Sequence, residues 1–280
     1  MALPVDFLST SLSLAAVVAW GTSDFLGGYS SRTANAFLLT TIAHASGLLL
    51  MVTVATASHA PFPIHSSALW AFAGGLSGGG ALAIFYRALS QGRMGLTAPV
   101  AAVLGAAIPT LFVMFTAGAP SPVHIAGFLL AAIGIWLISR TEDGSGTEGI
   151  GFAALAGIGF AGFYLCMRQA GNGSALWIAA LSRLASFTLT GIIVLLIGAR
   201  RITPQSAGWG VLAGCLDVTG SALFVRASQT GRLDTAVVLT SLYPAVTVLL
   251  ARLILKEHFT RWKAVGMFAA LLAVPMIAAQ

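Results

Sequence analysis

Four ionisable side chains lie inside long apolar stretches of the sequence, where a charged group is costly and usually faces a cavity or a partner. They are Asp24, His44, Arg183 and Asp217. At a helical rise of about 1.5 Å per residue, each lies within a turn or two of the middle of the bilayer. A carboxyl group removed from water can carry a proton, and an arginine can bind an anionic group. We therefore predict that the four residues line a central cavity, with a coupling proton on a carboxyl and Arg183 against the substrate.

A structural role is the alternative for the same side chains. Arg183 and Asp217 would then form a permanent ion pair that only satisfies two buried charges. Trp20, one turn before Asp24, either has a functional role, in stacking on a substrate or in gating the cavity, or packs against neighbouring helices. The sequence leaves both alternatives open.

The composition indicates which elements hold these residues. Hydrophobic residues make up 58% of the 280 residues and charged residues only 8%, against about 45–50% and 25% in soluble domains. The apolar residues recur in blocks of about 18–24, the length of a membrane-spanning helix. We predict an all-α integral membrane protein with ten transmembrane helices. The expected spans are 12–29, 35–57, 68–89, 96–117, 123–139, 150–167, 175–198, 207–227, 235–255 and 262–279.

The two halves of the chain resemble each other at a shift of 139 residues. The shift aligns the stretches RALSQGRMG and RASQTGRLD and places His44 on Arg183. It also pairs Trp70 with Trp209, Gly75 with Gly214, Phe85 with Phe224, Arg87 with Arg226, Arg93 with Arg232 and Gly127 with Gly266. Because five spans is an odd number, the second half enters the membrane from the opposite side, as in many transporters with inverted repeats. The predicted domains are a first repeat over 1–140, a polar linker over 141–149 and a second repeat over 150–280.

Two segments carry a resemblance to a known family. WGTSDF, from Trp20 to Phe25, is similar to the first-helix signature of the EamA-type domain in the drug/metabolite transporter superfamily. The segment from Leu242 to Val274 resembles the end of the second copy of that domain, with Pro244, Glu257 and Gly266 in the expected order. The resemblance implies transport of small solutes, often the export of amino acids or other metabolites. The first copy departs from the pattern, because Gly118 stands where the second copy has Glu257.

Glycines and prolines inside the spans have structural interpretations. The run GGLSGGG lacks the GK[ST] ending of a phosphate-binding loop and favours close helix packing. Pro99 and Pro109 in the fourth span, and Pro244 in the ninth, are expected to kink helices beside a central pathway.

Other functional classes fit the sequence less well. The basic residues are scattered at span ends, which does not favour nucleic-acid binding despite the net charge of +6. Cys166 and Cys215 both lie in apolar segments, which indicates buried packing rather than a disulfide. No HExxH, nucleotide-binding or metal-ligand motif occurs, so we expect neither an enzyme nor a cofactor or metal. A structural subunit would not need two aspartates at membrane depth, and an aqueous channel would show uncoupled flux.

We predict a secondary transporter in the bacterial cytoplasmic membrane that works by alternating access. An amino acid or related zwitterion is the expected solute, export the expected direction and a proton the candidate coupling ion. The alternative is an uncoupled facilitator, or an exporter of cationic drugs, nucleobases or sugars. The expected partners are the small-molecule solute and the lipid bilayer, with protons as candidates, and we expect no nucleic acid. A monomer is expected, with a dimer as the alternative.

The orientation in the membrane receives conflicting signals. Three basic residues flank the spans on the side of the termini and ten on the other side, which predicts that the termini lie outside. The family resemblance implies cytoplasmic termini.

Overall fold

The computed structural model describes residues 5–92, 94–117, 121–139, 148–171, 173–230, 236, 239–240, 242–257 and 260–278. Within these residues the chain forms ten helices and no strands, which confirms the predicted fold class. The first half contains α1 (Val5–Ser30), α2 (Ala36–Ala57), α3 (His65–Gln91), α4 (Met94–Ala117) and α5 (Pro122–Ser139). The second half contains α6 (Ile150–Ala170), α7 (Ala175–Ile197), α8 (Pro204–Thr230), α10 (Tyr243–Ile254) and α11 (Arg261–Ala278).

The exterior of the bundle has the character of a lipid-facing surface. Five described helices, α2, α3, α6, α7 and α8, are long and apolar enough to cross a membrane. Large apolar side chains point outward from them: Leu195 is 78% exposed and Leu196 is 81% exposed. Such residues would be unfavourable in water and are suited to a hydrocarbon environment. The protein is therefore a multi-pass membrane protein.

Local sequence signals account for several helix ends. The Asn35 side chain accepts hydrogen bonds from the backbone N–H groups of Phe37 and Leu38, which caps the start of α2. Gly198 ends α7 in the left-handed region, at φ 67°, where a glycine is favoured.

The ninth span differs from the expected kinked helix. Pro244 lies in the first turn of α10, and Leu242 precedes it in a turn. A proline in the first turn removes no intrahelical hydrogen bond, so it starts this helix rather than bending it. Pro99 and Pro109 do lie inside α4, as predicted. Most of 235–241 lies outside the described residues, as do 141–147 of the predicted linker and Gly118.

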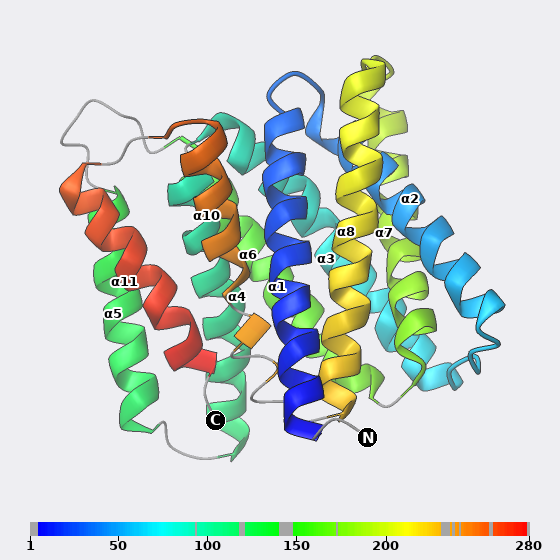
Figure 1. Cartoon of the computed structure of the whole chain (residues 1–280), viewed down its shortest axis with the longest axis horizontal. Coiled ribbons are helices and arrows are strands. Elements are labelled where there is room, and N and C mark those ends of the chain that lie inside the picture. The colour runs from blue at the N-terminus through cyan, green and yellow to red at the C-terminus, as the bar shows by residue number, and fades with distance from the viewer. Residues whose placement is uncertain are drawn as a thin grey trace.

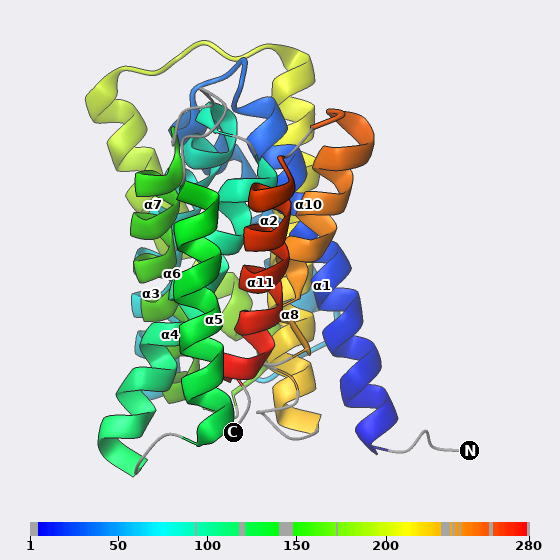
Figure 2. The same ribbon diagram turned by 90° about the vertical axis from the view of Figure 1, so that its left-hand side faces the viewer.

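The helices of the two halves pack against one another throughout the bundle. α5 and α11 form a pair at one end and α2 and α7 a pair at the other (Figures 1 and 2). Between them, α1 packs on α8 and α3 packs on α6. α1 begins and α11 ends at the same edge, called here the terminal edge (Figure 1). Because successive helices alternate in direction, α6 runs opposite to its counterpart α1.

Close contacts repeat at the 139-residue shift. A Cβ atom on Gly220 would lie 2.7 Å from the Trp20 ring, and one on Gly159 would lie 2.7 Å from Cβ of Ala81. Trp20 and Gly159 are equivalent at the 139-residue shift, and so are Ala81 and Gly220. The second contact is therefore the repeat counterpart of the first. The two halves thus pack as inverted repeats around an approximate two-fold axis, whereas the exact domain boundaries stay a prediction.

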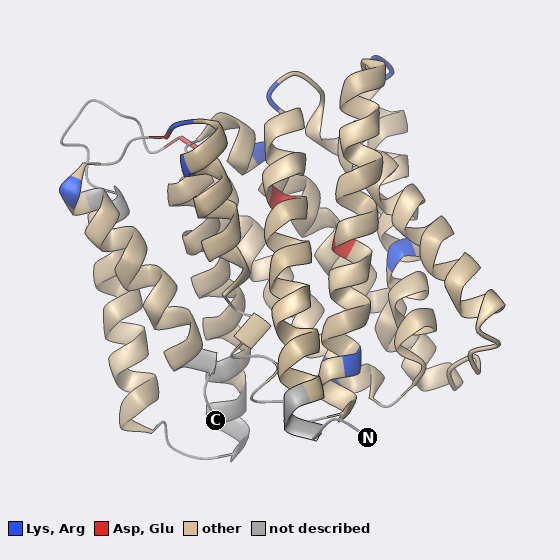
Figure 3. Ribbon diagram, viewed as in Figure 1, with Lys and Arg blue, Asp and Glu red and all other residues tan. Residues whose placement is uncertain are grey.

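Basic residues concentrate at the edge opposite the termini, called here the basic edge (Figure 3). The prediction that the termini lie outside is based on this uneven distribution of basic residues.

Candidate functional site

A cavity of about 500 Å³, counting the open space at its mouth, lies between the two halves. Its walls come from α1, α3, α6, α7, α8 and the start of α10. Asp217, which lies at the midpoint of α8, places the cavity at mid-depth in the bundle. The lining combines aromatic rings with polar groups. Its members are Trp20, Asp24, Gly78, Gly79, Leu82, Phe160, Phe163, Tyr164, Ser182, Arg183, Ser186, Asp217, Ser221 and Tyr243.

Arg183 and Asp217 form a buried ion pair in the wall of this cavity. Nη1 of Arg183 lies 2.8 Å from Oδ2 of Asp217. Nη2 of Arg183 donates to Oγ of Ser221 over 3.0 Å, and that hydroxyl donates to the Asp217 carbonyl over 3.0 Å. The pair is thus held in place by a residue one helical turn further along α8. Sequence reasoning missed Ser221, although its spacing of four residues from Asp217 was a usable signal.

His44 lies behind the ion pair rather than in the cavity wall. It is fully buried, and its Nδ1 atom lies 3.3 Å from Nη1 of Arg183. Since a guanidinium group can only donate, Nδ1 acts as the acceptor and the ring proton lies on Nε2. Nε2 faces the Gly79 carbonyl at 3.5 Å. His44 therefore orients Arg183 from the side away from the cavity.

Asp24 differs from Asp217 in its surroundings. It is 5% exposed and lines the same cavity from α1. Among the described residues, its carboxylate accepts no hydrogen bond and forms no ion pair. An ionised carboxylate in such a position is costly unless it takes up a proton or a cation. Asp24 is thus the carboxyl group of the cavity that is available for a ligand.

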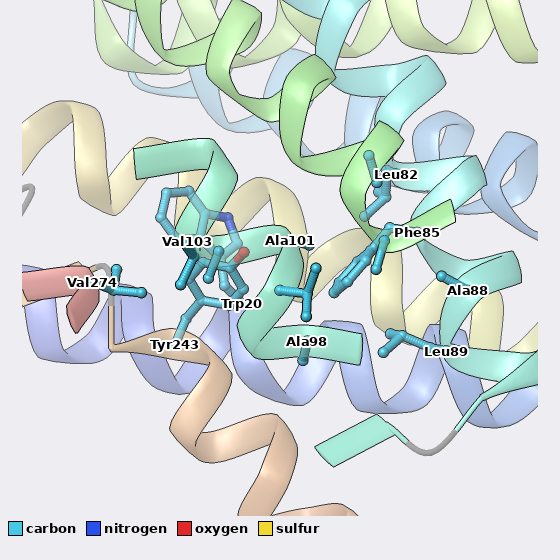
Figure 4. Close-up of a cluster of buried hydrophobic side chains, with 14 of the residues drawn as sticks. Trp20, Leu82, Phe85, Ala88, Leu89, Ala98, Ala101, Val103, Tyr243 and Val274 are labelled. Carbon is cyan, nitrogen blue, oxygen red and sulfur yellow. The ribbon is translucent and has the colours of Figure 1, made fainter. Parts of the chain in front are cut away.

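Trp20 forms a fixed wall of the cavity. Its Nε1 donates to the Asp217 carbonyl over 3.0 Å. Its ring packs against Phe224 at 5.6 Å and edge-on against Tyr243 at 6.0 Å between ring centroids. Figure 4 shows the ring beside Tyr243 and Val103. Trp20 is therefore both packed and exposed to the cavity, and the two alternatives for it are compatible.

Aromatic residues of the second half complete the wall. Phe163 and Tyr164 on α6 and Tyr243 on α10 line the cavity but were not proposed from the sequence as site residues. Apolar and aromatic side chains are so common in membrane helices that their number gave no signal. Only the packing of α6 and α10 against α1, α3 and α4 brings them together.

A packed layer of apolar side chains lies between the cavity and the basic edge. Phe85 and Leu89 follow the cavity residue Leu82 along α3 and are fully buried (Figure 4). Met94, at the start of α4, is also fully buried. A Cβ atom on Gly28 of α1 would lie 2.5 Å from Cβ of Leu89, so α1 and α3 touch closely at this level.

Glu257 connects several segments of the chain at the basic edge. Its carboxylate accepts hydrogen bonds from the backbone N–H groups of Met94 and Gly95, both at 3.1 Å. It also lies 3.4 Å from Nη2 of Arg32. A carboxylate at a helix N-terminus stabilises that end of the helix. Glu257 thereby ties the start of α4 and the α1–α2 connection to the α10–α11 connection. We call this set of contacts the Glu257 latch.

Neither metal ligation nor a disulfide is indicated in the part of the chain that the structure describes. No group of three or more His, Cys, Asp or Glu side chains there has the geometry to hold a metal ion. Cys166 and Cys215 are free thiols.

The structure defines a multi-pass helical membrane protein with a cavity between its two halves, and part of the chain resembles a known family. Residues 147–279 match the EamA-like transporter family. A solved structure described as "Crystal structure of protein" matches with a TM-score of 0.67 and 20% identity, over 96% of this chain and 95% of that one. This likeness shows the shared fold over nearly the whole chain. No curated protein matches. Residues 147–279, which make up most of the second half of the chain, therefore resemble a family of membrane transporters.

Proposed function

We propose that the protein is a secondary transporter of small amine-bearing metabolites, with amino acids and related zwitterions as the first class. The observation that carries this proposal is the buried carboxylate of Asp24, which lines the cavity without a partner among the described residues. A carboxylate in that position binds an ammonium group, and the neighbouring aromatic faces attract the same positive charge.

The ion pair limits how Arg183 takes part. Its charge is balanced by Asp217, and both terminal nitrogens already have partners. Its Nε atom is buried without an acceptor among the described residues. We propose that a zwitterion places its ammonium group on Asp24 and directs its carboxylate toward the Arg183 end of the cavity. A small shift of Arg183 would then present Nε to that carboxylate.

Proton coupling follows from the same carboxylate. Asp24 can hold a proton or an ammonium group, but not both at once. Protonation of Asp24 would release the substrate, and loss of the proton would prepare the site for the next substrate molecule. With a proton gradient across the membrane, this competition exchanges protons for substrate and drives export.

Alternating access requires that the two edges open in turn. We propose that the Glu257 latch and the packed layer close the cavity toward the basic edge. The latch releases when the two halves rock about the two-fold axis, which opens the cavity on that side.

A second candidate is uncoupled transport of cationic aromatic compounds. The observation that favours it is the charge of the cavity: with Asp24 ionised, the two aspartates outweigh Arg183, and several aromatic rings surround them. Such a cavity accepts a cation without needing a substrate carboxylate.

The experiment is counterflow in proteoliposomes loaded with unlabelled compound, which detects carrier-mediated exchange without any assumption about the driving force. Four labelled compounds of similar size separate the charge classes: phenylalanine, benzyltrimethylammonium, phenylpropionate and uracil. We expect exchange of phenylalanine, whereas exchange of benzyltrimethylammonium alone would favour the second candidate. Exchange confined to phenylpropionate or uracil, above the level in protein-free liposomes, would overturn both. The Asp24→Asn variant should lose exchange of every amine.

A further inference from the structure

A second cavity lies at the basic edge, apart from the candidate site. It has a volume of about 610 Å³, counting the open space at its mouth, and is lined by the α1–α2 connection, the start of α2 and the last turns of α3. Arg32 and Arg87 both line it, and we call it the Arg32–Arg87 pocket. None of its described lining residues is acidic.

The two guanidinium groups keep donors available for a ligand. Arg87 lies over the Phe152 ring, with Cζ 5.1 Å from the ring centroid. This contact uses the face of the guanidinium group and leaves its N–H edge for hydrogen bonds. Arg32 contacts Glu257 through one nitrogen at 3.4 Å, and two backbone N–H groups already bind that carboxylate. Glu257 therefore balances Arg32 only in part.

Two further features of the pocket favour an anion. Ser31 is 8% exposed, and its Oγ is a buried polar atom without a hydrogen-bond partner among the described residues. A buried hydroxyl of this kind costs free energy unless a ligand or water satisfies it. The residues Ala34, Asn35 and Ala36 at the start of α2 also line the pocket, so the positive end of that helix dipole faces it.

The pocket is not a product of the repeat. Arg87 has the counterpart Arg226 near the terminal edge, but the residue 139 positions after Arg32 is Gly171, which has no charge. The positions equivalent to Arg32 and Arg87 therefore carry only one arginine between them. The internal repeat alone therefore does not explain why both arginines are present in this pocket.

We propose that the Arg32–Arg87 pocket binds a phosphate group, either the phosphodiester of an anionic lipid headgroup or a phosphate in solution. Two guanidinium groups and a free hydroxyl are donors that tetrahedral oxyanions prefer. The positive end of the α2 dipole adds electrostatic attraction, although Asn35 already accepts hydrogen bonds from Phe37 and Leu38. The pocket lies at the edge where basic residues concentrate, which is also where anionic headgroups would meet the protein (Figure 3).

The test measures thermal stability of the purified, detergent-solubilised protein during titration with three probes. The probes are dioctanoyl phosphatidylglycerol, inorganic phosphate and dioctanoylglycerol, which has the same chains without the phosphate. We expect saturable stabilisation by phosphatidylglycerol if the source is a lipid, or by inorganic phosphate if the source is soluble. Equal stabilisation by dioctanoylglycerol would overturn the proposal, and so would stabilisation by none of the three.

Three variants assign the effect to the pocket. Arg87→Gln removes one guanidinium group and should weaken the apparent affinity about tenfold or more, as expected for a lost charge-assisted hydrogen bond. Arg226→Gln, at the repeat-equivalent position, is the matched control and should leave the affinity unchanged. Ser31→Ala removes a donor that has no described partner, so it should weaken binding without loss of stability in the absence of probe. Equal effects of the two arginine variants, with unchanged binding in Ser31→Ala, would contradict the proposal.

Discussion

His44 and Arg183, which lie 139 residues apart, contact each other directly: Nδ1 of His44 is 3.3 Å from Nη1 of Arg183. The separation equals the shift that aligns the two halves, so the contact joins equivalent positions and must lie close to the two-fold axis. The candidate site is thus built where the two halves meet.

The chemistry of the site is nevertheless asymmetric. Asp24 and Phe163 are equivalent at the 139-residue shift, and both line the cavity. Asp217 and Gly78 are equivalent in the same way and also line it. At these two pairs of positions both halves contribute to the lining, but each acid occurs in one half only. The two halves thus share a symmetric fold, but the charges in the cavity are distributed asymmetrically. Such a distribution suits a substrate with a positive group at one end and a negative group at the other.

The Arg183–Asp217 pair should behave as a coupled unit in mutants. Asp217→Asn leaves a buried arginine without its counter-charge and should destabilise the protein by about 3–5 kcal/mol. Removal of both charges in the double variant Arg183→Gln/Asp217→Asn should restore much of that loss. Melting in detergent measures the stability of the two single variants and the double variant. Additive losses in the double variant would contradict this interpretation.

Transport by the same double variant separates the two roles of the pair. A merely structural pair predicts that the stable double variant still carries substrate. Contact between Arg183 and the substrate carboxylate predicts loss of phenylalanine exchange with retention of benzyltrimethylammonium exchange.

Two glycines of α8 differ in how much space surrounds them, because only one of them packs closely against another helix. A Cβ atom on Gly214 would collide with the Ala43 carbonyl of α2, whereas one on Gly208 would have nothing within 4 Å. Gly214→Ala should therefore cost about 1–3 kcal/mol of stability through overpacking. Gly208→Ala should be neutral or stabilise by up to about 1 kcal/mol, since alanine favours the helix. Equal melting temperatures of the two variants would show that α2 and α8 do not pack as described.

The Glu257 latch should control access from the basic edge. A cysteine at the cavity position Ser182, in a background with Cys166→Ala and Cys215→Ala, reports access to a membrane-impermeant maleimide. Glu257→Ala should speed labelling from the basic edge several-fold, because it removes both hydrogen bonds to the start of α4.

Arg32→Ala is the control for the charge of the latch. The Arg32 side chain is 34% exposed, and partly exposed ion pairs contribute little. We expect a smaller increase in labelling than for Glu257→Ala. Unchanged labelling in Glu257→Ala, measured in vesicles of both orientations, would remove the latch from the gating mechanism.

Much of the fold could be predicted from the sequence because lipid imposes simple rules. The apolar blocks predicted nine of the ten spans, with most ends within a few residues of the observed helix ends. The largest difference among these nine is the start of the first span, which begins at Val5 rather than near residue 12. The ninth span was harder, because a proline can either kink a helix or start one, and Pro244 starts α10.

The site could be predicted only in part. Charged residues at membrane depth are rare, so Asp24, Arg183 and Asp217 stood out, and the structure places all three around one cavity. His44 stood out for the same reason but lies behind Arg183, since depth along a helix does not reveal which way a side chain faces. Tyr164 and Tyr243 gave no signal, because their position depends on tertiary packing.

Proton-gradient-driven transport in proteoliposomes tests the central claim most directly, with wild type, Asp24→Glu and Asp24→Asn compared side by side. The account predicts that wild type concentrates an amine-bearing substrate against its gradient when protons flow the other way. Asp24→Glu, which keeps a carboxyl group, should retain part of this activity, and Asp24→Asn should lose all of it while its melting temperature stays close to that of wild type. Gradient-driven accumulation by Asp24→Asn at the wild-type rate would show that this carboxyl group carries neither the proton nor the substrate.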